Sequence, residues 1–188
     1  MTYVLLAVLV VIVIWFVGAY NGLIALKNQV VNAWKQIDVQ LKRRHDLIPN
    51  LVNTVKGYMQ YEQGTLEAVI SARNRAVSAQ GVADTARAEG ELTQALGRLF
   101  ALTENYPELK SSQNVLQLQE ELTSTENKVG FARQLYNDVA TQYNTRQAQF
   151  PTNLVAGIAQ ASPAELWEIE DGRERSVPAV DLSFGKRG

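Results

Sequence analysis

The chain has 188 residues, no cysteine, a single histidine and a formal net charge of −1. The lack of cysteine excludes a disulfide framework and a thiolate metal site, and the balanced charge provides no general attraction to nucleic acid, so we expect no nucleic-acid partner. A chain of this length can form one domain with one sizeable core.

An apolar segment opens the chain. Every residue from Tyr3 to Tyr20 except Gly18 is apolar or aromatic, and the first charged side chain is Lys27. A helix needs about 20 apolar residues to cross a hydrocarbon core of roughly 30 Å, so the run from Tyr3 to Leu23 predicts a single membrane span. The residues expected in the span or at its two interfaces are Tyr3, Val4, Leu5, Trp15, Phe16 and Tyr20.

A cleaved signal peptide is the alternative for this segment, because Val17-Gly18-Ala19 offers small residues at a plausible cleavage site. Signal peptides begin with positive charge and have apolar regions of roughly 7 to 15 residues. This chain has no Lys or Arg before its apolar run, and the run is longer. The sequence therefore favours an anchor, which we place at residues 1–26.

Positive charges near the span predict its orientation. Five Lys or Arg residues lie between Lys27 and Arg44, and none precedes the span. Positive residues stay on the cytoplasmic side of a membrane, so we expect the N-terminus outside and the following domain in the cytoplasm.

The charge is also uneven along the chain. Residues 27–75 hold eight Lys or Arg against four Asp or Glu, whereas residues 84–188 hold ten against fifteen. Each cation close to a membrane surface gains about 1 kcal/mol from anionic headgroups. The alternative is a solvated helix face on which these cations pair with Asp38 and Asp46. The candidate lipid-headgroup contacts are Lys42, Arg43 and Arg44.

Beyond the span, apolar residues recur with a helical period, and the helical segments show no strand alternation. The clearest seven-residue series are Trp34, Leu41, Ile48, Val55 and Val115, Leu122, Val129, Tyr136, Tyr143, Phe150. The pattern predicts an all-α fold. One predicted helical segment ends near Ala79. The next helix is predicted from about Asp84 to Glu104, and the last from about Pro107 to Gln149. Helices of this length suit an antiparallel bundle, which we place at residues 27–151.

Pro49 interrupts this pattern. Proline lacks the backbone N–H of a helix and crowds the carbonyl four residues earlier, so the helix is expected to kink or end there. The series Trp34, Leu41, Ile48, Val55 nevertheless stays in step through the proline. The residues alone do not decide between a kinked helix and a turn between two helices at Pro49.

The tail, residues 152–188, differs in character and is expected to be extended. It carries large apolar side chains that need a surface to cover them. We expect a homo-oligomer in which the segment from Leu154 to Phe184 packs on a neighbouring subunit, with packing on its own bundle as the alternative. The candidate contact residues are Trp167, Ile169, Val180, Leu182 and Phe184.

A polar set interrupts the last predicted helix beside its apolar seam. Its members are Glu126, Asn127, Arg133, Asn137 and Asn144. Side chains four and seven residues apart share a helix face. Buried, these groups would form a hydrogen-bonded layer that fixes helix register. The other interpretation is a polar binding groove.

Catalytic and cofactor motifs are missing from the sequence. His45 is the single histidine, and the sequence gives it no recognisable Ser-His-Asp pairing. We expect it to be a solvated helix-end residue; the alternative is a pH-responsive group near the bilayer. The chain has no Glu-x-x-His of a di-iron bundle and no phosphate-binding glycine loop. We expect neither an enzyme nor a cofactor or metal site.

The ordered motifs resemble the LemA family of bacterial membrane proteins. They are Tyr20-Asn21, Asn32-Ala33-Trp34, Ile37-Asp38-Val39-Gln40-Leu41, Arg43-Arg44, Asp46-Leu47-Ile48-Pro49-Asn50-Leu51, Ala72-Arg73, Glu104-Asn105-Tyr106-Pro107, Leu118-Gln119, Glu126-Asn127, Ala132-Arg133, Tyr136-Asn137, Tyr143-Asn144 and Phe150-Pro151. The resemblance implies one N-terminal membrane helix with the N-terminus outside, in the bacterial inner membrane. It also implies a four-helix domain, and thus a break between two helices at Pro49.

Two functions follow as hypotheses. The first is a membrane-anchored, oligomerising scaffold or adaptor for another membrane protein; the resemblance implies a metalloprotease of the HtpX type as a partner. The alternative is a membrane-anchored ligand-binding sensor that uses the polar groove on the last helix.

Overall fold

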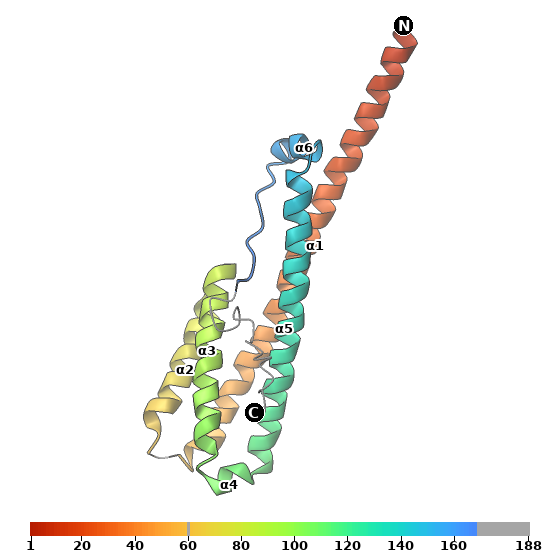
Figure 1. Ribbon diagram of the computed structural model, residues 1–188. Helices are drawn as coiled ribbons and strands as arrows, with labels where there is room; N and C mark the ends of the chain where they lie inside the picture. The colour runs from red at the N-terminus through yellow and green to blue at the C-terminus, as the bar shows by residue number, and fades with distance from the viewer. Residues whose placement is uncertain (60, 169–188) are drawn as a thin grey trace, which may run out of the picture.

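The structure is a computed structural model that describes residues 1–59 and 61–168 (Figure 1). Every regular element within these residues is an α-helix and none is a strand, which confirms the all-α class for this part of the chain. The helices are α1 (Thr2–Lys56), α2 (Gln63–Ser78), α3 (Val82–Thr103), α4 (Pro107–Lys110), α5 (Gln113–Ala148) and α6 (Thr152–Ile158).

The first part of α1 projects from the rest of the molecule (Figure 1). Residues 1–15 are exposed, and this end of α1 is long and apolar enough to cross a membrane, which makes it a candidate span. Burial begins at Ala19 and Leu23, which pack into the helical domain. The candidate span and the first helix of the domain are therefore one continuous helix.

Pro49 lies inside α1, so the expected break at this residue is wrong. Its ring faces solvent and removes one helical hydrogen bond, the one to the carbonyl of His45. Arg73 Nε, from α2, donates to that carbonyl instead, at 3.3 Å. The chain turns only after Lys56, and the helix expected to continue to Ala79 is α2.

Two apolar cores are stacked along the domain. The proximal core, beside the candidate span, is built from α1, α5, α6 and Trp167. The distal core adds α2, α3 and α4, whose buried apolar residues all belong to it. Helices α1 and α5 run side by side through both cores, whereas α2 and α3 lie mainly over the distal core (Figure 1). The start of α3, at Val82 and Ala86, also packs against the proximal core.

The C-terminal part of the chain differs from the expected extended tail. The long helix expected from Pro107 to Gln149 is divided into α4 and α5, and α6 follows at residues 152–158. Residues 161–168 have no regular structure and run back along α5 (Figure 1). The predicted contact residues Ile169, Val180, Leu182 and Phe184 lie outside the described residues.

Candidate functional site: a charge layer and a docked segment

Four charged or titratable side chains meet where the two cores adjoin. Arg44 and His45 come from α1, Glu89 from α3 and Glu126 from α5. Arg44 Nη1 lies 2.7 Å from Glu89 Oε2, and Arg44 Nη2 lies 2.6 Å from Glu126 Oε2. His45 Nε2 lies 2.5 Å from Glu89 Oε1. We call these four residues the charge layer; it links α1 to α3 and α5.

Burial makes the pairing in the charge layer important. The side chains of Arg44 and Glu89 are 4% and 5% exposed. Removing a charge from water costs several kcal/mol unless a partner compensates it. Arg44 Nη2 also donates to Thr93 Oγ1 at 2.9 Å. Glu126 Oε2 is buried and ion-paired with Arg44, but it accepts no hydrogen bond from the described residues.

The charge layer is not a metal site. Within residues 1–59 and 61–168, no group of three or more His, Cys, Asp or Glu side chains is placed to hold a metal ion. The guanidinium of Arg44 occupies the position between the two carboxylates. This arrangement joins helices rather than supplying an open coordination position.

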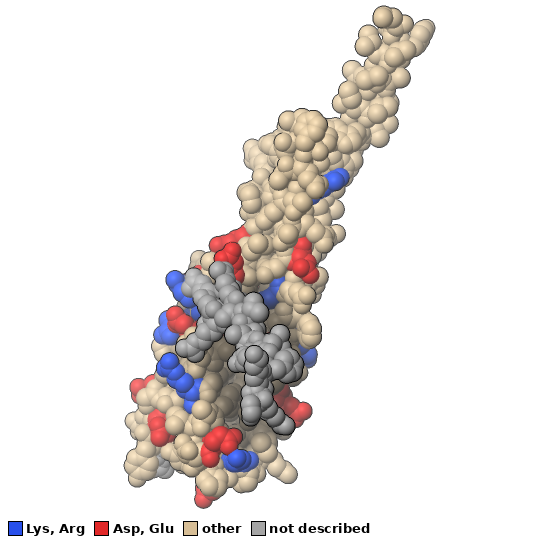
Figure 2. Space-filling model, in the orientation of Figure 1, with Lys and Arg blue, Asp and Glu red and all other residues tan. Residues whose placement is uncertain are grey.

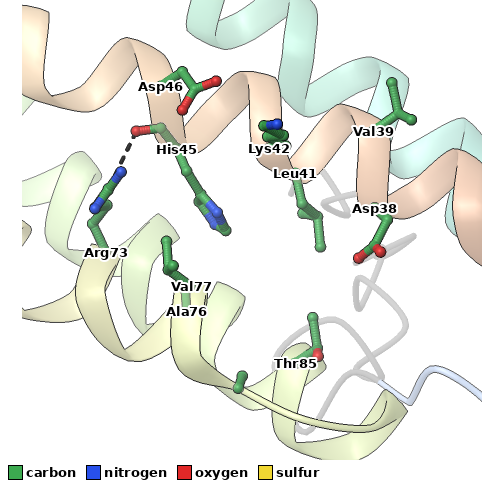
Figure 3. Close-up of a pocket in the computed structure, with 11 residues that line it drawn as sticks. Asp38, Val39, Leu41, Lys42, His45, Asp46, Arg73, Ala76, Val77 and Thr85 are labelled. Atoms are coloured by element: carbon green, nitrogen blue, oxygen red, sulfur yellow. Dashed lines mark hydrogen bonds between the residues drawn. The ribbon is translucent and has the colours of Figure 1, made fainter.

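A shallow cavity of about 480 Å³ lies beside the charge layer, between α1, α2 and the start of α3. Asp38 and Thr85 lie toward one end of it and Arg73 toward the other, with the His45 ring between them (Figure 3). The lining contains acidic, basic and apolar side chains, and Leu41 is one of the apolar ones. Such a cavity can accept a small polar molecule.

Two asparagines on α5 bind the backbone of the segment at residues 161–168, which we call the docked segment. Asn144 donates to the Ala164 carbonyl and accepts from the Ala164 N–H, both at 2.8 Å. Asn137 pairs in the same way with the carbonyl and N–H of Trp167, at 3.0 and 2.8 Å. Each side-chain amide therefore satisfies both backbone groups of one residue.

The spacing of these pairs follows from the geometry of the two elements. Asn137 and Asn144 are seven residues apart, which is about 10.5 Å along a helix. Ala164 and Trp167 are three residues apart, which is about 10 Å in an extended chain. Because the distances match, an extended segment running opposite to α5 meets both asparagines in register.

Trp167 anchors the docked segment in the proximal core, where it is 4% exposed. Its ring centroid lies 6.0 Å from that of Trp34, and Arg133 Cζ lies 5.1 Å from the ring centroid on its face. Trp34 in turn meets Tyr136 edge-on at 5.4 Å. The docked segment thus combines an aromatic anchor with backbone hydrogen bonds.

Two tyrosines on α5 have altered proton affinities. Burial raises the pKa of Tyr136 above 10.0, and the nearby Glu165 carboxylate raises it further. The Tyr136 hydroxyl donates to the Glu165 carbonyl at 2.6 Å. Burial also raises the pKa of Tyr143. In both cases the environment favours the neutral phenol.

A groove of about 490 Å³ lies on the outside of the α1–α5 pair. Val39, Phe131 and Leu135 line it and remain 63%, 73% and 45% exposed. Lys35 and Lys128 also line it, and none of the described lining residues carries a carboxylate. We call this the outer groove; its lining combines apolar and basic side chains.

Comparison with known proteins identifies the family. The model of the LemA family matches residues 33–182, a range that includes the charge layer and the docked segment. The chain belongs to the LemA family.

Three relatives extend the comparison of this LemA-family chain. Protein LemA of Metamycoplasma hominis is 29% identical over 171 residues, covering 86% of this chain and 78% of the relative. Magnetosome protein MamQ 2 of Paramagnetospirillum magneticum is 22% identical over 189 residues, covering 87% and 70%. Magnetosome protein MamQ of Magnetospirillum gryphiswaldense is 23% identical over 165 residues, covering 74% and 61%.

The structure of the LemA-family chain corrects two predictions about α1. Arg44 is buried against Glu89, so it is not exposed as a headgroup contact must be, and His45 is not solvated. Both residues lie between Leu41 and Ile48 on the buried face of α1, so the apolar spacing was the signal that could have placed them inside. Lys42 and Arg43 are exposed, and their headgroup role stays a prediction.

The polar set predicted on α5 is divided between two places. Glu126 joins the charge layer, while Asn137, Asn144 and Arg133 meet the docked segment. Asn127 is exposed. The predicted polar groove at these asparagines is thus filled by the chain itself, and the prediction that Trp167 contacts a neighbouring subunit is wrong because Trp167 packs on α1 and α5 of its own chain.

Sequence reasoning missed several partners of these residues. Glu89 lies on the same face of α3 as the buried Thr85 and Leu92, and that spacing was its available signal. The pairing of Arg73 with the His45 carbonyl had no sequence signal, because it depends on how α2 packs against α1.

Proposed function

We propose that this protein is a membrane-anchored, oligomerising scaffold. Its cytoplasmic domain, an antiparallel four-helix bundle of α1, α2, α3 and α5, binds another membrane protein through the outer groove. No catalytic step is part of this proposal. The family resemblance makes an HtpX-type metalloprotease the first partner to test.

The observation that carries the proposal is the continuity of α1. This helix runs from Thr2 to Lys56, so the candidate span enters the proximal core without a linker. A flexible tether would let the domain sample many orientations, whereas a continuous helix fixes it relative to the membrane. A fixed orientation suits a protein that presents one surface to a neighbour in the same membrane.

The outer groove supplies that surface. Exposed aromatic and aliphatic side chains gathered in a groove are typical of binding sites, and aromatic anchors contribute a large share of binding energy. Because Lys35 and Lys128 line the groove, its complementary partner is an apolar segment flanked by Asp or Glu.

Binding is tested with Phe131→Asp in the full-length chain, co-expressed with the membrane metalloprotease of the same organism. Loss of an aromatic anchor is expected to weaken co-purification by about tenfold or more, equivalent to about 1.4 kcal/mol. Val77→Asp is the matched control, since Val77 is also exposed but lies on α2. Equal co-purification of both variants and the parent chain would argue against the outer groove.

Orientation is tested by a reporter fused after Gly188. We expect a reporter that works only in the cytoplasm to be active, because the cations that follow the candidate span favour the cytoplasmic side. Activity of a reporter that requires the periplasm would overturn the orientation and, with it, the cytoplasmic scaffold.

The second candidate function is a ligand-binding sensor, which the cavity beside His45 favours. A ligand that binds only the folded state raises thermal stability by mass action. A monomeric protein that binds no membrane partner and gains thermal stability with a small polar molecule would support the sensor over the scaffold.

A further inference from the structure

Helix α6 combines a buried face with an apolar exposed face. Val155 and Ala156 are buried in the proximal core, together with Ala19 and Leu23 of α1. On the other side, Leu154 and Ile158 are 62% and 68% exposed. Residues four apart share a helix face, so these two side chains form one apolar surface.

The chain around α6 has no charge. No Asp, Glu, Lys or Arg occurs between Arg146 and Glu165, and Phe150, just before α6, is 81% exposed. A face of this kind would be costly in water unless something covers it. Figure 2 shows charged side chains on the part of the molecule below α6, and none on the projecting end of α1.

The position of α6 identifies what covers this face. It packs on α1 and shares the proximal core with Ala19 and Leu23, which follow directly after the exposed apolar run that is the candidate span. Trp15 and Tyr20, at the same end of the span, are the aromatic residues expected at a membrane interface. Helix α6 therefore lies at the level where the bilayer meets the domain.

The charges on α1 and α5 independently indicate the same boundary between bilayer and domain. The Trp34–Tyr136 ring contact is a common reference point on the two helices. At 1.5 Å per residue, the first cation toward the membrane is Lys27 on α1, about 11 Å from this contact, and Arg146 on α5, about 15 Å from it. Both helices become free of charge beyond these cations. α6 lies on the uncharged side of this boundary.

We propose that α6 is a second membrane contact of this protein: it lies in the headgroup region of the bilayer, with Leu154, Ile158 and Phe150 in contact with lipid. Amphipathic helices that bind membranes lie in this orientation, parallel to the surface, with the apolar face at the boundary between headgroups and acyl chains. The inference rests on the proposed membrane anchoring by α1, and it adds a contact that fixes the domain around the axis of α1.

The experiment measures the surroundings of single spin labels in full-length protein in nanodiscs of phosphatidylethanolamine and phosphatidylglycerol. The chain has no cysteine, so Leu154→Cys and Ile158→Cys each give one labelled site. Both residues are exposed, so labelling leaves the core intact. Oxygen partitions into lipid and a nickel chelate into water, so the ratio of their collision rates reports what each label contacts.

We expect labels at Leu154 and Ile158 to collide more often with oxygen than with the nickel chelate, at a depth like that of Tyr20→Cys. Val8→Cys in the span is the lipid control and exposed Ser124→Cys on α5 is the water control. If the α6 labels behave like Ser124, or are shielded from both reagents by protein, the proposal is wrong although the anchor stands. If Val8 also faces water, the membrane anchoring itself fails.

Discussion

At the scale of single residues, Asn137 and Asn144 show how a helix binds an extended chain through its backbone groups and not through its side chains. Each amide matches one backbone N–H and one backbone carbonyl, so the pairing depends on register rather than on the residue bound. A side-chain anchor is supplied instead by Trp167, which packs against Trp34 and Arg133 in the proximal core.

Asn137→Ala is expected to loosen the docked segment. It removes two hydrogen bonds to Trp167, each contributing about 1 kcal/mol, and leaves the buried backbone groups unpaired. Hydrogen exchange at the Trp167 amide should accelerate by roughly thirtyfold, which corresponds to about 2 kcal/mol. Gln142→Ala, at an exposed position on the same helix, is the control and should leave this exchange rate unchanged.

The raised pKa of Tyr136 predicts alkaline loosening of the same segment. The folded state holds the phenolic proton more tightly than the unfolded state, so stability is constant below pH 10.0 and falls as the pH rises above it. Tyr136→Phe should cost about 1 kcal/mol at neutral pH through the lost hydrogen bond to Glu165. It should also flatten the alkaline decline, measured by denaturant unfolding from pH 9 to 11. An unchanged decline would exclude Tyr136 as its source, leaving Tyr143.

At the scale of elements, the charge layer joins α1 to α3 and α5. Arg44→Met is expected to destabilise the domain by about 3 kcal/mol or more, because Glu89 loses its buried cation. Arg43→Met, at the exposed neighbouring position, should change stability by no more than about 0.5 kcal/mol. Thermal unfolding followed by circular dichroism measures both. Similar effects of the two substitutions would show that the charge layer adds little.

Pro49 and Arg73 form a second link between elements. In Pro49→Ala, an alanine N–H can bond the His45 carbonyl, so Arg73 loses its distinctive acceptor. Arg73→Ala should therefore destabilise the parent chain more than the Pro49→Ala chain, with a coupling of about 0.5–1 kcal/mol in a double-mutant cycle. Additive effects would mean that the 3.3 Å contact contributes nothing.

Periodicity predicted the helices well where packing and pattern agree. The seven-residue series placed the buried Leu41, Ile48 and Val55 on one face of α1, as the structure has them. The break at Pro49 was mispredicted because a residue from another helix, Arg73, compensates the lost hydrogen bond. The partners of Asn137 and Asn144 could not be predicted from the sequence, because they are backbone groups, which carry no sequence signature.

At the scale of the whole molecule, the docked segment changes what oligomerisation can depend on. Trp167 packs within its own chain, so Trp167→Ala should release the docked segment without lowering the mass of a detergent-solubilised assembly, measured by light scattering. Phe131→Asp, in the outer groove, should lower the mass if copies associate there. A lower mass with Trp167→Ala alone would return the oligomer contact to the C-terminal part of the chain.

Because α1 is unbroken, a tilt of its membrane end also displaces the distal end of the domain. From Leu23 to Lys56 the helix extends about 50 Å, at 1.5 Å per residue, so with the proposed span in a bilayer the distal end of the domain would stand about that far from it. Membrane helices tilt by about 20° on average, and tilt adjusts to bilayer thickness. A tilt of that size moves the distal end sideways by about 17 Å. With the proposed span in a bilayer, a change in thickness that alters the tilt would therefore move the α2–α3 end of the domain toward a neighbour or away from it.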